Sequence, residues 1–211
     1  MRKILSTYTG IIIIANIAMF ILSLILINIY GEVVYDYLAL QPAMFLSGKN
    51  LWTLITSMFM HANLTHLFVN MLSLFFIGSF VEKLIGKKRF IIFYFAAGIA
   101  AGLLFILISA LTGIDVNTFA VGASGAIFGL GGLLAVLTPK LPVLVFFIIP
   151  MPMWLAMIFL LGILWLLSFA IGLPIGNIAH LGGLLAGIGY GFYLKYKYPR
   201  KTAMISKYFS R

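Results

Sequence analysis

The sequence has 211 residues, of which 64% are hydrophobic, only 9% are charged and none is cysteine. Soluble domains are about half apolar and about a quarter charged, so this composition, with a mean hydropathy of +1.18, excludes a soluble globular enzyme and a disordered chain. The lack of cysteine excludes disulfides, thiolate metal sites and cysteine nucleophiles.

Six apolar segments follow one another along the chain and predict six membrane-spanning helices. A helix is expected for each because lipid offers the backbone no other hydrogen-bond partner. Spans of about 20 residues would take up more than half of the chain and leave only short connections. We therefore expect an all-α membrane protein, a single six-helix domain over residues 1–211, with spans near 8–29, 63–83, 90–112, 122–137, 153–170 and 177–195.

The segments around these spans are less regular. The first span follows Arg2 and Lys3, yet its length and the lack of a small-residue cleavage site argue against a signal peptide. Residues 30–62 are too polar at their beginning to cross a membrane, and Trp52 is typical of the interface. Residues 138–152 hold four prolines, so we expect a connection at the membrane edge rather than a seventh span.

The net charge of +10 is concentrated in alternating connections. All basic residues except Lys49 fall in the two tails, the second connection and the fourth connection, which a six-span topology places on one side. Because basic loops stay in the cytoplasm, we expect both termini there, in the plasma membrane of a prokaryote. The alternation indicates membrane lipids, and not nucleic acid, as the partner of these charges.

Polar side chains inside spans are costly and are therefore candidates for function. Four stand out: His66 and Asn70 in the second span, Ser124 at the start of the fourth, and His180 near the start of the sixth. In the expected topology all four lie at one depth, about 5–10 Å below the outer surface. Each alone is typical of a structural role, but their common depth favours a site.

Stripes of small residues predict that two of these spans touch. Glycines recur beside His180 in the sixth span and beside Ser124 in the fourth span: Gly183, Gly187 and Gly191 in the former, and Gly125, Gly129 and Gly132 in the latter. Small residues let membrane helices approach closely. The spacing predicts a crossing that brings Ser124 within hydrogen-bond reach of His180, although helix packing alone would also explain the stripes.

The chemistry of this pair is that of a nucleophile and a base. A serine hydroxyl needs a neighbouring base to become nucleophilic, and a neutral imidazole can take its proton near neutral pH. No acidic residue falls well inside a span, so we expect a Ser124–His180 dyad rather than a triad. Phe128, one turn after Ser124, is expected to stack on the imidazole.

Donors for a negatively charged intermediate are also present. Gly122 and Gly125 flank Ser124 at the start of its helix, where the backbone N–H of Ser124 is free to donate. Asn70 and His66, four residues apart, add side-chain donors on one helix face. We predict no metal and no cofactor, because the histidines come without a His-Glu-x-x-His motif or a nearby carboxylate.

Taken in order, these motifs resemble those of the rhomboid family of intramembrane serine proteases. Residues 61–70 match its HxxxxHxxxN pattern, residues 122–125 its GxSG, and residues 179–183 its sixth-helix histidine motif. Residues 78–86 fit a further pattern, GxxxExxxG. The resemblance covers the whole chain and implies a six-helix core that hydrolyses transmembrane segments of other proteins.

By matching position, the resemblance implies a role for five residues: Ser124 as nucleophile, His180 as base, Asn70 and His66 as oxyanion donors together with the Ser124 amide, and His61 in a structural part. The chain departs from many members at two positions. Thr53 follows Trp52 where many have arginine, and Phe128 stands where many have tyrosine. The second change keeps a ring for stacking and loses a hydroxyl.

Three functions remain open from the sequence. The favoured one is an intramembrane serine endopeptidase that cleaves transmembrane segments near the extracytoplasmic face. A non-catalytic rhomboid-like binder or chaperone of transmembrane helices would use the same fold. A small-solute transporter is least favoured, because it would need polar residues along the full depth of the bilayer.

Overall fold

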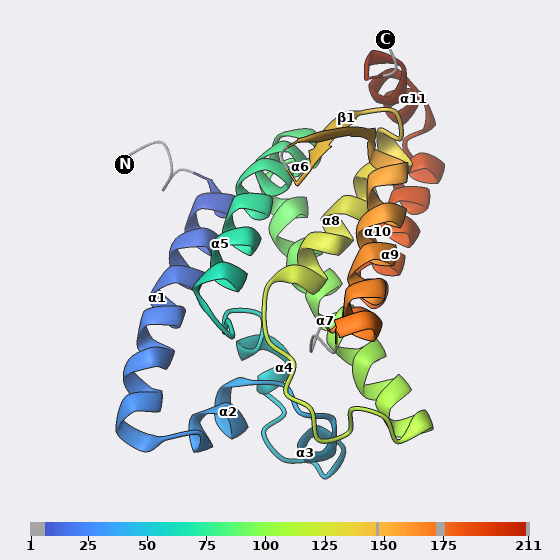
Figure 1. The fold of residues 1–211 in the computed structure, drawn as a ribbon. Helices are drawn as coiled ribbons and strands as arrows, with labels where there is room; N and C mark the ends of the chain where they lie inside the picture. Colours follow the sequence, from blue (N-terminus) through green and yellow to red (C-terminus); the bar gives the residue numbers. More distant parts are fainter. Residues whose placement is uncertain (1–6, 147, 172–175, 210–211) are drawn as a thin grey trace.

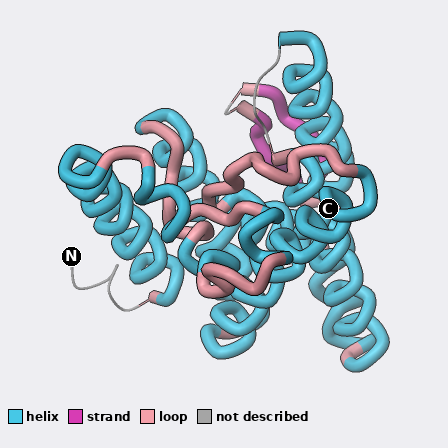
Figure 2. Tube along the Cα trace, turned by 90° about the horizontal axis from the view of Figure 1, so that it is seen from below, coloured by secondary structure: helices cyan, strands magenta, loops and turns pink. Residues whose placement is uncertain are grey.

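A computed structural model describes residues 7–146, 148–171 and 176–209, and the chain is mostly helical (Figure 1). Seen from below, one short pair of strands interrupts the helices (Figure 2). The bundle is built from α1 (Tyr8–Tyr30), α5 (Leu64–Ser73), α6 (Ser79–Ile85), α7 (Lys87–Thr112), α8 (Ser124–Leu137), α9 (Met153–Ile171) and α10 (Asn177–Lys197). A π-helical turn, η1 (Leu74–Gly78), joins α5 to α6 so that the three run as one helix.

Four of the described helices are long and apolar enough to cross a membrane: Tyr8–Tyr30, Leu64–Ile85, Lys87–Thr112 and Met153–Ala170. By length and hydropathy, the described residues therefore provide four membrane-spanning helices, fewer than the six that the sequence predicted. Of the other two bundle helices, α8 has only 14 residues and α10 is rich in glycine. Most of α8 is buried, so its neighbours in the bundle, rather than lipid, surround it.

The closest helix contact in the bundle is between α8 and α10. A Cβ atom placed on Gly183 would overlap the carbonyl oxygen of Gly125, and one on Gly187 would overlap that of Gly129. Gly129 also has no room for a side chain against α7, because a Cβ there would come within 2.5 Å of Ala97 Cβ. The glycine stripes therefore bring two helix backbones into direct contact at the centre of the bundle.

The two ends of the bundle carry different structures (Figure 1). At one end, which we call the loop end, lie α2 (Val33–Leu38), α3 (Pro42–Leu46), α4 (Thr53–Thr56) and the segment 113–123. At the other, which we call the basic end, lie the α6–α7 junction, the strands and α11 (Pro199–Tyr208). The start of α1 and the end of α11 are both at the basic end.

The proline-containing connection at the basic end is an antiparallel hairpin of β1 (Pro142–Val145) and β2 (Ile149–Pro152). Val143 pairs with Met151 in its register. The sequence predicted a connection here and did not predict strands. Pairing satisfies the backbone groups of a short apolar run that is too short to span the membrane as a helix.

Glu82 on α6 is hydrogen-bonded to the first residues of α1. Its carboxylate accepts hydrogen bonds from the backbone N–H of Tyr8 at 2.9 Å and of Thr9 at 2.9 Å, and from the Thr9 hydroxyl at 2.7 Å. The first N–H groups of a helix have no partner within the helix and carry partial positive charge. The buried carboxylate of Glu82 therefore supplies the hydrogen-bond acceptors that these N–H groups lack.

Candidate active site

Ser124 is the first residue of α8, and the backbone before it is held in a fixed, unusual conformation. Gly122 has a φ of +115°, and its N–H donates a hydrogen bond to the carbonyl of Ser57 at 2.8 Å. A Cβ atom on Gly122 would lie 2.7 Å from Cε1 and 2.9 Å from Nε2 of His66. Glycine is thus required twice here, for the backbone angle and for the space beside the imidazole.

The structure brings the hydroxyl of Ser124 against the imidazole of His180. Ser124 Oγ lies 2.7 Å from His180 Nε2, and the His180 side chain is buried. In the tautomer that carries its proton on Nδ1, the hydroxyl donates this hydrogen bond to Nε2. Nδ1 of His180 is itself buried and has no hydrogen-bond partner among the described residues. Of the residue types that make up a catalytic triad, the site therefore brings together a serine and a histidine.

An aromatic ring fixes the orientation of the imidazole. Phe128, one turn after Ser124 in α8, stacks on His180 with ring centroids 4.7 Å apart and planes inclined by 18°. The backbone contact between Gly125 and Gly183 sets the distance between the two helices at this level. The ring position is therefore determined by packing on one face and by the serine hydroxyl at one edge.

The candidate oxyanion donors lie on α5, beside the loop that leads to Ser124. The side chain of Asn63 caps α5 by accepting from the backbone N–H of His66 at 2.8 Å, which places the His66 imidazole next to Gly122. Asn70 is buried, and its Nδ2 donates to the carbonyl of His66 at 2.8 Å. No hydrogen bond joins either side chain to Ser124 in the described part of the chain.

His61 lies in the loop before α5 and is buried there. Its ring is 5.1 Å from that of His66, at an interplanar angle of 62°. Burial and the nearby charge of His66 lower the pKa of His61 to about 4, so His61 is neutral at physiological pH. Neutral and buried against the His66 ring, His61 packs as a support for that residue.

Within the loop end, the segment that precedes Ser124 is hydrogen-bonded to residues 40–43. The sequence did not indicate this pairing. Leu40 and Ala120 exchange two backbone hydrogen bonds, of 3.0 and 2.8 Å. Nearby, the N–H of Ala43 donates to the carbonyl of Val116 at 2.9 Å, and Gln41 Nε2 donates to that of Asn117 at 2.9 Å. These pairs join segments about 75 residues apart. Neither segment contains a motif that would have revealed the pairing.

Comparison with known proteins places this arrangement in a family. Residues 48–197, which include Ser124 and His180, match the model of the Rhomboid domain. Rhomboid-like protease 3 of Toxoplasma gondii is 30% identical over 202 residues, which are 93% of this chain and 71% of that protein.

Two further relatives are matched over a smaller share of their own length. RHOMBOID-like protein 1 of Arabidopsis thaliana is 36% identical over 156 residues, 73% of this chain and 37% of that protein. Rhomboid protein 1, mitochondrial, of Saccharomyces cerevisiae is 33% identical over 146 residues, 67% of this chain and 41% of that protein. The chain thus spans about two fifths of the length of these two relatives.

The resemblance drawn from the motifs is confirmed by these matches. The family and the apolar helices support an integral membrane protein. Since the domain model covers well over half of the chain, the protein is a member of the rhomboid family.

Proposed function

We propose that the protein is a serine endopeptidase that hydrolyses transmembrane segments of membrane proteins at the level of Ser124. The observation that carries the proposal is the 2.7 Å distance between Ser124 Oγ and His180 Nε2. It is supported by the family, whose relatives include a named protease. A hydroxyl and a base in contact inside a bundle have the geometry that acyl transfer requires.

The proposed reaction proceeds through an acyl-enzyme. The Ser124 hydroxyl passes its proton to Nε2 of His180 while Oγ bonds to the scissile carbonyl carbon. His180 then returns that proton to the departing amine as the peptide C–N bond breaks. In the second half, water takes the place of the hydroxyl, and hydrolysis of the ester frees the new carboxylate and Ser124.

The negative charge on the carbonyl oxygen is stabilised by three donors in this proposal. They are the backbone N–H of Ser124 at the start of α8 and the side chains of His66 and Asn70. The Asn70 amide has two N–H groups and uses one for the His66 carbonyl, so the second remains for an oxyanion. Hydrogen-bond donors that point at the developing charge stabilise it more strongly in a site that excludes water than they would in water.

The substrate helix is proposed to enter beside α9 and to unwind locally. Of the four apolar spans, α9 is the least buried: 17% of the residues in its most apolar stretch are buried, against 28–44% in the other three. An intact helix hides its carbonyls in intrahelical hydrogen bonds, so a substrate must open near the cleavage site. Glycine or proline at that point lowers the cost of opening, and such residues are expected in substrates.

The orientation proposed from charge places the basic end, with both termini, in the cytoplasm of a prokaryotic cell. The native sequence has no cysteine, which makes a direct test simple. Lys207→Cys and Asp115→Cys place single thiols at opposite ends. In intact cells, an impermeant maleimide should label Asp115→Cys and leave Lys207→Cys unlabelled until the membrane is opened. The reverse pattern would invert the proposed topology.

The test of the enzymatic activity is cleavage of a reporter transmembrane segment by the purified protein. Ser124→Ala should abolish cleavage, and Ser47→Ala, at an exposed serine of the loop end, should retain it. A fluorophosphonate should label the native protein at Ser124, and His180→Ala should prevent labelling. Unchanged cleavage by Ser124→Ala would refute the mechanism. Stable capture of the uncut segment by the native protein would instead indicate a binder of transmembrane helices.

A further inference from the structure

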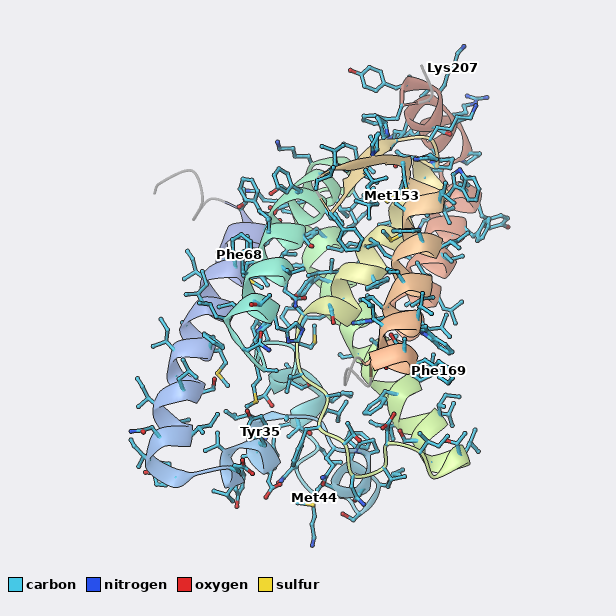
Figure 3. All side chains as sticks on the ribbon, viewed as in Figure 1. Tyr35, Met44, Phe68, Met153, Phe169 and Lys207 are labelled. Carbon is cyan, nitrogen blue, oxygen red and sulfur yellow. The ribbon has the colours of Figure 1, made fainter. Side chains whose placement is uncertain are left out.

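A groove at the basic end lies between the end of α10 and the following helix α11. Its volume is about 610 Å³. Figure 3 shows Lys207 at the tip of this end, on α11. The groove is lined by two lysines and four smaller residues: Lys195, Lys207, Pro199, Thr202, Ala203 and Ser206. It lies at the end of the bundle opposite the segment 113–123 that leads to Ser124, so it is separate from the candidate active site.

The two lysines of the groove have no counter-charge among the residues that the structure describes. Neither Lys195 nor Lys207 has a hydrogen bond or an ion pair with another described residue. Three of the four acidic residues belong to the loop end, and the fourth, Glu82, is occupied by the start of α1. The side chain of Lys195 is half-buried, which places its stem against the protein and leaves its ammonium group to face the groove. An anion in the groove would compensate for both charges.

Neighbouring cations differ in this respect. Lys197 donates to the hydroxyl of Tyr193 at 2.9 Å and lies over the Tyr198 ring. Arg89 donates to the hydroxyl of Tyr198 at 3.0 Å, with its guanidinium carbon 5.0 Å from the ring centroid. These two cations are held by aromatic partners within the protein. The groove lysines are left for a ligand from outside.

The surroundings of the groove favour a lipid over a free anion. Met204 and Tyr208 on α11 are 72% and 74% exposed, so an apolar and an amphipathic side chain neighbour Lys207 on that helix. The groove begins at the last turn of α10, which carries Lys195 and Lys197, and basic residues at the end of a membrane helix are typical of the headgroup level. We propose that it binds the headgroup of an anionic phospholipid, whose phosphate is shared by Lys195 and Lys207 and whose acyl chains run beside the bundle.

The test is binding of phosphatidylglycerol to the detergent-solubilised protein, counted by native mass spectrometry. The double variant Lys195→Ala/Lys207→Ala removes both groove charges. The matched control, Lys83→Ala/Lys88→Ala, removes two exposed lysines at the same end of the bundle and outside the groove, neither of which has a partner among the described residues. Each lysine near a lipid headgroup is worth about fivefold in affinity, so we expect roughly 25-fold weaker binding for the groove variant.

The control variant should bind phosphatidylglycerol within about twofold of the native protein. Equal losses of lipid binding in both variants would mean that the lipid is attracted by positive charge in general, and the proposed site would be wrong. Full binding by the groove variant would overturn the site as well. Phosphatidylcholine should not compete, because it carries no net charge. If inorganic phosphate competes at concentrations similar to those of the lipid, the ligand is a free anion and the lipid assignment is wrong. None of these outcomes depends on the protease activity.

Discussion

The helices α9 and α10 both pack on α8, but in different ways. α10 meets α8 backbone to backbone at Gly183 and Gly187, where a single added carbon would overlap a carbonyl oxygen. α9 meets α8 mainly through side chains, such as Met157 against Gly131, and exposes Phe169 almost completely (Figure 3). The contact between α8 and α10 therefore sets the distance between Ser124 and His180, whereas the contact between α8 and α9 depends on side chains such as that of Met157.

The largest effect is expected from an added carbon at the α8–α10 contact. Gly183→Ala forces the two helices apart, and a displacement of about 1 Å at reacting groups costs on the order of 100-fold in rate. We therefore expect at least that loss in cleavage, together with a lower unfolding temperature. Gly189→Ala in the same helix is the matched control, since its added carbon would meet no atom within 4 Å.

The same substitution in α9 tests the looser of the two contacts with α8. Gly162→Ala also adds a carbon in open space, and we expect cleavage and unfolding temperature to stay close to the native values. Equal tolerance at Gly183, Gly189 and Gly162 would show that the α8–α10 contact is not the rigid part of the molecule.

The next largest effect concerns the proposed oxyanion donors. Loss of one such donor costs about 10²–10³ in kcat, so Asn70→Ala should slow cleavage by that factor with little change in KM. Labelling of Ser124 by a fluorophosphonate distinguishes a lost donor from a collapsed site. A near-normal rate would remove Asn70 from the role, although its hydrogen bond to the His66 carbonyl would still account for its burial.

A smaller effect is expected at the ring that stacks on His180. Aromatic pairs contribute about 0.5–1.5 kcal/mol beyond the area they bury, so Phe128→Leu should lower kcat by about twofold to tenfold. Phe128→Tyr keeps the ring and should retain most of the rate. A loss as large as that of Asn70→Ala would mean that Phe128 holds the whole helix contact rather than the imidazole alone.

The smallest effect is expected on the outer face of α9. Phe169 is 92% exposed, and Phe169→Ala should change the unfolding free energy by less than about 0.5 kcal/mol. The measurement is the unfolding midpoint in detergent, compared with that of the buried Met157→Ala on the same helix. A large loss of stability at Phe169 would contradict the view that α9 is loosely attached.

The sequence allowed the parts of this fold that follow from local periodicity to be predicted. Hydropathy indicated a helical membrane protein, and the glycine spacing indicated that Ser124 and His180 approach each other, which is the geometry observed. The pairing of Leu40 with Ala120 was not predictable, because backbone hydrogen bonds between distant segments leave no side-chain pattern.

Two further features were missed for physical reasons of their own. The hairpin of residues 142–152 alternates only weakly, since most of its side chains are apolar on both faces. The helix α11 is short and polar, and in the sequence it is indistinguishable from a solvated tail.

The carboxylate of Glu82 has a consequence for how the protein is made. Its hydrogen bonds to Thr9 cross 73 positions of the chain, so at about 5–20 residues per second α1 waits roughly 4–15 s after its own synthesis before this fastening exists. During that interval α1 must stay in the bilayer without these hydrogen bonds. Its mean hydropathy of 2.8 is the highest of the four apolar spans, which favours its retention in lipid before they form.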